Sequence, residues 1–151
     1  MIGFLVSIVG CDVAMDTLKP GVSTTADVLK VMGKPSGEWK DADGTTTLEF
    51  TRQPEGVQNY MVTFGPEGVL KEIRQVLTDA NFQKVARGMS KDEIRRRLGK
   101  PGKTATFPLK KEEVWTWKYQ PQPGSTFDFH VHFDLGGAVV NTSRTPADTA
   151  A

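Results

Sequence analysis

The sequence predicts an α+β fold of two tandem helix-helix-β-β-β units, with the helices packed on one face of antiparallel sheet. Three observations predict this fold. A helix-ending motif occurs twice, as MGKP at residues 32–35 and LGKP at residues 98–101. An aromatic segment follows each motif, and a Val-x-Phe segment with a glycine turn follows each aromatic segment. Recurrence of one supersecondary pattern indicates two copies of one structural unit.

Each motif ends a short helix that begins at a capping box. Thr24 and Ser90 are hydroxyl N-caps, and Asp27 and Glu93, three residues later, can reach back to the N-cap amide. The glycine of each motif stands where a left-handed C-cap is expected, and the proline two residues later cannot continue the helix. A further helix is predicted before each of these, over residues 13–19 and 78–87.

Three strands are predicted after the helices of each unit, and the short turns between them indicate antiparallel pairing. The predicted strands cover residues 45–53, 59–65 and 69–77, then 113–120, 126–134 and 138–144. Apolar and polar residues alternate in them, which predicts a sheet with one buried and one solvent-facing side. The polar side is expected to carry Glu49, Thr51, Thr116, Lys118, Asp128, His130 and His132.

The segment before the first unit carries the single cysteine, Cys11, at the end of an uncharged, mostly apolar run. The run is shorter than the roughly 20 residues that span a bilayer, and it fits the apolar part of a secretory signal. Residues 8–11 match a bacterial lipobox, in which the cysteine thiol receives the lipid. No Lys or Arg precedes Cys11, which departs from the usual start of a signal. The alternative is a buried N-terminal strand with an inert cysteine.

Four segments are therefore predicted: a lipoprotein signal at residues 1–11, a first repeat at 12–77, a second repeat at 78–145 and a disordered tail at 146–151. The 19 Lys and Arg nearly balance the 18 Asp and Glu, so the net charge of +1 gives no general attraction to nucleic acid or to an anionic membrane. A single cysteine excludes an internal disulfide.

Helix, Gly-x-Pro motif, aromatic strand, Val-x-Phe strand and glycine turn follow one another in both units. The residues that carry this pattern are 88–90, 94, 98–101, 115–119, 131–134 and 137 in the second unit, and 21, 28, 32–35, 48–50, 62–64 and 68 in the first. The pattern resembles the SmpA/OmlA family of BamE-like outer-membrane lipoproteins. Family members often carry one unit, whereas the tandem arrangement is similar to that of the β-lactamase inhibitor proteins. Those proteins are stapled by disulfides, which this chain cannot form.

The resemblance implies a non-catalytic envelope protein, lipid-anchored on the periplasmic side, whose partners include the β-barrel assembly machinery. It implies the outer membrane, although Asp12 after the cysteine resembles an inner-membrane retention signal. A second interpretation is a secreted or periplasmic inhibitor that binds another protein through its sheet. Neither interpretation involves a cofactor, a nucleic acid or a small-molecule substrate. The sequence shows no nucleophile–base motif and no phosphate-binding glycine loop.

Five residues are the candidates for partner binding. Lys118, Asp128, His130 and His132 belong to the expected polar side of the sheet, and Trp39 is expected on an exposed loop among charged residues. A third interpretation is a small zinc protein, since the two histidines share one side of a strand. Structural zinc requires closed tetrahedral ligation, and no cysteine is available to complete it. We therefore expect no native metal site.

Overall fold

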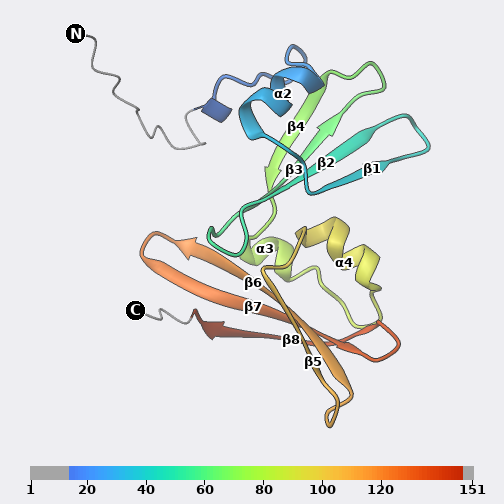
Figure 1. Ribbon diagram of the computed structural model, residues 1–151, viewed down its shortest axis with the longest axis vertical. Coiled ribbons are helices and arrows are strands. Elements are labelled where there is room, and N and C mark those ends of the chain that lie inside the picture. Colours follow the sequence, from blue (N-terminus) through green and yellow to red (C-terminus); the bar gives the residue numbers. More distant parts are fainter. Residues whose placement is uncertain (1–13, 148–151) are drawn as a thin grey trace. The chain divides into compact units, whose positions relative to one another are not determined.

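The computed structural model describes residues 14–147; Cys11, the predicted signal segment and residues 148–151 of the predicted tail lie outside the described residues. The chain forms two four-stranded antiparallel sheets, with strand orders β1-β2-β3-β4 and β5-β6-β7-β8 (Figure 1). The first contains β1 (Gly37–Lys40), β2 (Thr46–Thr51), β3 (Asn59–Phe64) and β4 (Leu70–Gln75). The second contains β5 (Lys103–Phe107), β6 (Glu112–Gln122), β7 (Ser125–Asp134) and β8 (Val139–Pro146).

Short helices precede the sheets: α2 (Thr25–Met32), α3 (Asp79–Phe82) and α4 (Lys91–Leu98). The predicted α+β fold of helix-helix-β-β-β units is therefore wrong, because the described chain is mostly β. The additional strands β1 and β5 are short edge strands that expose most of their side chains. An edge strand without a buried side has no apolar alternation, which is the signal on which the sequence prediction depended.

The helix predicted over residues 78–87 is also shorter than expected. Thr78 caps it as predicted, since its hydroxyl accepts a hydrogen bond from the amide of Asn81. The helix ends at Phe82, however, and the chain then turns so that the amide of Gly88 donates to the carbonyl of Val139 at 2.9 Å. Bonding to β8 thus overrides the local helix propensity of this segment.

The predicted N-caps of α2 and α4 are confirmed. The Thr24 hydroxyl accepts from the amide of Asp27 at 3.3 Å, and the Ser90 hydroxyl accepts from the amide of Glu93 at 3.1 Å. Gly33 and Gly99 follow the helices with φ of 85° and 78°, as a positive-φ cap requires, but with ψ of −148° and −170°. This conformation is extended in ψ instead of left-handed helical, and it is essentially restricted to glycine.

The repeated motif has a counterpart in the hydrogen bonds of both halves. The amide of Gly21 donates to the carbonyl of Leu70 at 2.8 Å, and the amide of Gly88 donates to that of Val139 at 2.9 Å. The N-cap residue of each main helix also forms an isolated bridge to the start of the last strand. Each half therefore ties the segment before its main helix to the last strand of its own sheet.

Internal contacts divide the chain into two compact units. The first comprises Met1–Leu48 with Val62–Ile73, and the second comprises Glu49–Met61 with Arg74–Ala151. In the first unit, buried side chains of α2 and the sheet form the core, namely Val28, Met32, Leu48, Val62, Phe64 and Leu70. The second unit therefore includes the β2–β3 connection in addition to α3, α4 and the second sheet.

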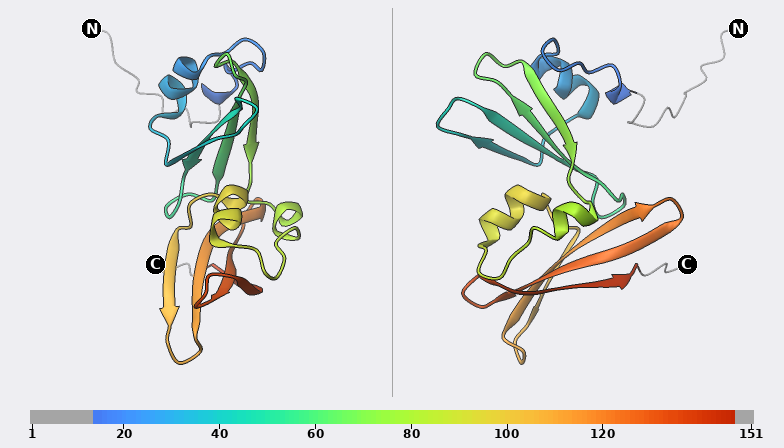
Figure 2. Two further views of the ribbon diagram at one scale, coloured as in Figure 1. Left: turned by 90° about the vertical axis from the view of Figure 1, so that its right-hand side faces the viewer. Right: turned by 180° about the vertical axis from the view of Figure 1, so that it is seen from behind.

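In the second unit, α3 and α4 lie over one face of the β5–β8 sheet (Figure 2). The ring of Phe82 on α3 stacks on Phe129 with centroids 3.9 Å apart, and it meets Tyr119 edge-on at 4.7 Å. Ile94 and Leu98 of α4 are fully buried, as is Trp117 of β6. This aromatic layer is the hydrophobic core of the second unit.

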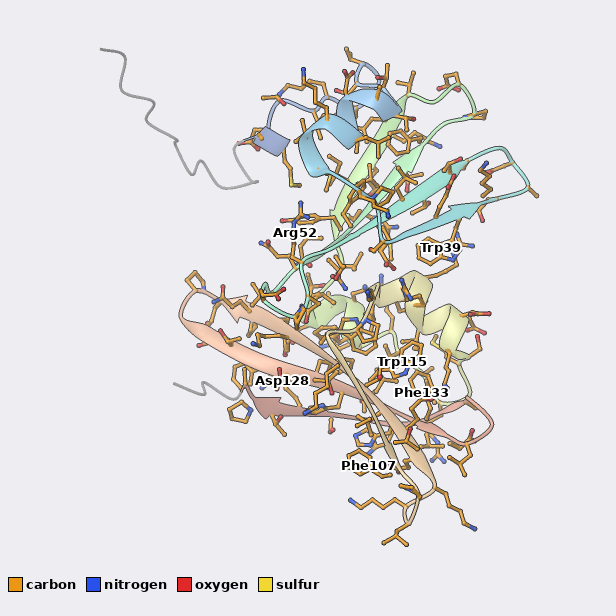
Figure 3. The ribbon with its side chains drawn as sticks, in the orientation of Figure 1. Trp39, Arg52, Phe107, Trp115, Asp128 and Phe133 are labelled. Carbon is orange, nitrogen blue, oxygen red and sulfur yellow. The ribbon has the colours of Figure 1, made fainter. Side chains whose placement is uncertain are left out.

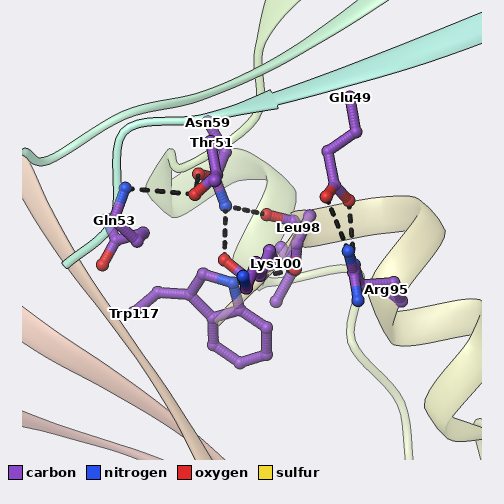
Figure 4. A network of polar contacts seen from close by, with 9 residues as sticks. Glu49, Thr51, Gln53, Asn59, Arg95, Leu98, Lys100 and Trp117 are labelled. Atoms are coloured by element: carbon purple, nitrogen blue, oxygen red, sulfur yellow. Dashed lines mark hydrogen bonds and ion pairs between the residues drawn. The ribbon is translucent and has the colours of Figure 1, made fainter. Parts of the chain in front are cut away.

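A polar network joins the Glu49–Met61 segment to the C-terminal end of α4 (Figure 4). The buried amide of Asn59 donates to the carbonyls of Leu98 at 2.8 Å and Lys100 at 3.0 Å, and its oxygen accepts from the Thr51 hydroxyl at 2.7 Å. The indole of Trp117 donates to the carbonyl of Gly99 at 3.1 Å. These bonds satisfy carbonyls that the end of a helix leaves without partners.

Glu49 is the second anchor of this network. Its side chain is fully buried, and its carboxylate accepts from Arg95 Nε at 2.9 Å and from Nη2 at 2.8 Å. One prediction is therefore wrong: Glu49 and Thr51 do not belong to an open polar face. Alternation cannot distinguish an exposed carboxylate from one buried against a guanidinium in this bidentate geometry.

Candidate functional site

The candidate site is the face of the β5–β8 sheet opposite α3 and α4, here called the polar face. Successive side chains of a strand point to opposite faces of the sheet. Trp117, Phe129 and Val131 point into the core, so the residues next to them along each strand point away from it. Asp128, labelled in Figure 3, is one of them. The polar residues of this face are Lys103, Glu112, Thr116, Lys118, Asp128, His130, His132, Asp134, Asn141, Ser143 and Thr145, and the register also places Ala105, Phe107 and Val114 on it.

His130 lies at the centre of this face and bridges two neighbouring strands. Its Nδ1 is 2.8 Å from the Thr116 hydroxyl on β6, and its Nε2 is 2.8 Å from the Thr145 hydroxyl on β8. Burial lowers the pKa of His130 below its ordinary value, and the charge of Asp128 opposes this only in part. His130 is therefore a neutral hydrogen-bonding group at pH 7, and protonation becomes less favourable in the folded protein than in the unfolded chain.

His132 forms a second bridge. Its Nδ1 is 3.1 Å from Glu112 Oε2, and its Nε2 is 2.8 Å from the Ser143 hydroxyl. A zinc ion would have to displace a hydroxyl or carboxylate from the ring nitrogens of either histidine. Over residues 14–147, no group of three or more His, Cys, Asp or Glu side chains is placed to hold a metal.

Contacts through the two nitrogens of His132 link the Ser143 hydroxyl to the Glu112 carboxylate. A hydroxyl, an imidazole and a carboxylate are connected in the same order in a hydrolase triad. Sequence reasoning found no serine beside a base, because the three residues lie on different strands. A hydrolase also needs donors for the oxyanion. Ser143 lies directly opposite His130 within the β7–β8 ladder, so its own amide is committed to the sheet. The Ser143 amide is therefore not available as an oxyanion donor.

A hollow of about 210 Å³ adjoins Lys118 and Asp128 at one end of the polar face. Gln53 closes it: its side-chain Nε2 donates to the carbonyl of Lys118 at 2.7 Å, and the amide of Lys118 donates to Gln53 Oε1 at 3.0 Å. Strand β5 begins at Lys103, opposite Thr116, so it does not extend far enough to pair with the backbone of Lys118. The side-chain amide of Gln53 makes the two hydrogen bonds to Lys118 that a peptide group of β5 would make if the strand continued. No local sequence signal indicated this role.

The structure brings four of the five candidate binding residues together. Lys118 and Asp128 are direct cross-strand partners, and His130 and His132 continue the same face. Trp39 belongs to the first compact unit, whereas the other four belong to the second. It is half-buried on edge strand β1 and not on a loop, so that prediction is wrong. Cys11 lies outside the described residues.

No protein-family model and no curated protein matches the chain. Among solved structures, one similar chain is a DUF4309 family protein (YjgB) from Bacillus subtilis, with 16% identity, a TM-score of 0.34, and coverage of 91% of this chain and 93% of that one. Another is a "putative beta-lactamase inhibitor protein" from Streptococcus mutans, with 12% identity, a TM-score of 0.34, and coverage of 89% and 94%.

The β-lactamase inhibitor part of the sequence resemblance thus has a counterpart among solved structures. The SmpA/OmlA part receives no support from these comparisons. A TM-score of 0.34 is too low for either similarity to carry a functional argument.

Proposed function

We propose that the protein is a non-catalytic binding protein that docks another protein on the polar face of the β5–β8 sheet. One observation carries the proposal: α3 and α4 cover only the opposite face, while cross-strand hydrogen bonds hold the polar side chains in place. Side chains that are already ordered lose little rotamer freedom when a partner binds, so they favour affinity. The neutral His130 and the hydroxyls beside it suit a polar, hydrogen-bonding partner surface.

Two partner classes follow from the sequence resemblance. A lipid-anchored protein would bind a component of outer-membrane protein assembly, whereas a soluble one would bind a secreted enzyme as an inhibitor does. Covalent labelling of Ser143 by a fluorophosphonate would contradict both, because it would show that the triad-like arrangement is reactive.

Charge reversal at Lys118 or Asp128 is expected to reduce partner binding at least tenfold, because like charges then face each other across the interface. The measurement is recovery of partners from solubilised membranes by each variant, with identification by mass spectrometry. The matched control is the exchange Lys118→Asp with Asp128→Lys, which preserves the net charge and the cross-strand pair. The exchange variant is expected to lose partner binding, whereas its free energy of unfolding should equal that of the wild type. An unchanged partner set, combined with loss of binding in Trp39→Ala, would move the contact to the first unit.

We propose in addition that Cys11 carries a lipid that anchors the protein to the periplasmic side of the envelope. Within residues 14–147, no helix is long and apolar enough to cross a bilayer. The variant Cys11→Ala is expected to move the protein from the membrane fraction to the soluble fraction, because it removes the acyl chains that hold it there. Fractionation and the intact mass of the native protein measure this. A membrane-bound Ala variant with an unlipidated native mass would contradict the proposal.

A further inference from the structure

Strand β8 forms one edge of the second sheet, and among the described strands it pairs only with β7. The amide of Ala147 donates to the carbonyl of Thr126 at 3.1 Å, which fixes the phase of the ladder. Bonding alternates along an antiparallel pair, so Thr142 and Arg144 direct their amides and carbonyls away from β7. Such a row of outward backbone groups is a template for a further strand.

Two hollows flank this edge, and Thr142 lines both of them. The first has a volume of about 370 Å³ and is lined by Asp79, Phe82, Gln83, Tyr119, Phe129 and Arg144 in addition. The second has a volume of about 190 Å³ and is lined by Val85, Arg87, Val139, Val140 and Asn141 in addition. We call these two hollows, with the outward backbone groups of β8 between them, the β8 groove. The strand lies at the margin of the sheet in Figure 2.

The first hollow has an apolar floor and a charged rim. Its floor contains Phe82 and Phe129, stacked at 3.9 Å and with an interplanar angle of 11°. At the rim, the Tyr119 hydroxyl donates to Asp79 Oδ1 at 2.8 Å and accepts from Arg144 Nη1 at 3.2 Å. These bonds position the guanidinium at the edge of an aromatic pocket, where it can meet a carboxylate.

The charged residues that line the two hollows indicate which kind of segment the groove favours. In the first hollow, Arg144 Nη1 lies 3.8 Å from Asp79 Oδ1, so these two charges compensate each other. Arg87 in the second hollow gives the described lining its net positive charge. The groove thus favours a segment with carboxylates. The alternation of an added strand would send every second side chain toward the aromatic floor. Backbone pairing supplies affinity in this mode, and the side-chain pockets supply selectivity.

We propose that the β8 groove binds an extended acidic segment of another protein as an added strand, with an aromatic or aliphatic side chain over Phe82 and Phe129. The side chains of Thr142 and Arg144 lie on the face opposite the polar face, since they are paired with Val131 and Phe129. The aromatic hollow thus lies on the opposite side of the sheet from the polar face, although Asn141 belongs to the polar face and also lines the second hollow.

A displayed library of random peptides, selected against the full chain, tests the proposal. The enriched peptides are expected to alternate apolar residues with others and to carry Asp or Glu. Their binding should weaken at least tenfold in Thr142→Pro, which removes one outward amide and leaves the bonds to β7 intact. Lys34→Glu, a charge reversal at an exposed residue of the first unit, is the control and should bind as the wild type does. Hydrogen exchange should show new protection of the Thr142 and Arg144 amides in the complex.

Arg144→Glu keeps the test decisive even where Thr142→Pro folds poorly. It is expected to lose the acidic peptides and to bind their counterparts with Lys in place of Glu. Failure to enrich any peptide, equal binding to the proline variant, or amide protection elsewhere would each overturn the proposal. Protection of Thr142 on concentration-dependent dimerisation, without peptide, would assign the edge to a second copy of the chain and would overturn it as well.

Discussion

Replacement of Arg95 by Met is expected to lower the free energy of unfolding by about 3–5 kcal/mol, because it removes the guanidinium that bonds both oxygens of a buried carboxylate. Glu49 is fully buried, and both of its oxygens accept from the Arg95 guanidinium. Met retains an unbranched apolar stem of similar length and a similar helix propensity, so the loss reports the ion pair and not the helix. Urea denaturation followed by tryptophan fluorescence measures it.

Arg96→Met is the matched control, since Arg96 is the next residue of the same helix and is exposed. Its effect is expected to be about 0–1 kcal/mol, as for other exposed charges. The double variant Glu49→Leu with Arg95→Met should recover much of the loss, because an apolar pair can replace a buried ion pair of similar volume. Equal destabilisation by the two single Arg variants would contradict the burial of this pair.

The parts of the fold that sequence could predict depend on neighbours along the chain. Thr24 with Asp27, and Ser90 with Glu93, specify helix starts within one turn, and the structure shows both caps. Glu49 shows the opposite case. Its burial depends on Arg95, which lies 46 residues away in sequence, and no local pattern records such a pairing. The strand count failed for a related reason, since β1 and β5 are held by pairing to a neighbour and not by an apolar face of their own.

The candidate site divides in the same way. Lys118 lies on β6, and Asp128, His130 and His132 follow the two-residue period of β7, so their shared face could be predicted from each strand alone. The groups that orient them could not. Ser143 on β8 contacts His132 on β7 diagonally, not as its direct cross-strand partner. Gln53 reaches Lys118 from the β2–β3 connection. Both contacts depend on register and on the path of the chain, which composition and spacing do not specify.

Gly99→Ala is expected to be the second large destabilisation, at about 3–4 kcal/mol, because it combines backbone strain with a steric clash. Gly99 has a φ of 78° and a ψ of −170°, a conformation that a residue with a Cβ rarely adopts. A Cβ there would lie 2.8 Å from Asn59 Nδ2. Asn59 is fully buried and holds the carbonyls of Leu98 and Lys100, so it cannot move without losing those bonds.

Gly33→Ala separates the strain from the clash. Gly33 has a φ of 85° at the same position after α2, but a Cβ there would meet nothing within 4 Å. Its expected cost is the strain alone, about 1–3 kcal/mol. In an Asn59→Gly background both the obstructing amide and the Cβ, which would lie 3.2 Å away, are absent, so Gly99→Ala should then cost no more than Gly33→Ala does in the wild type. If the two glycine variants already agree in the wild type, Asn59 does not constrain the end of α4. In that case the destabilisation would belong to the backbone conformation alone.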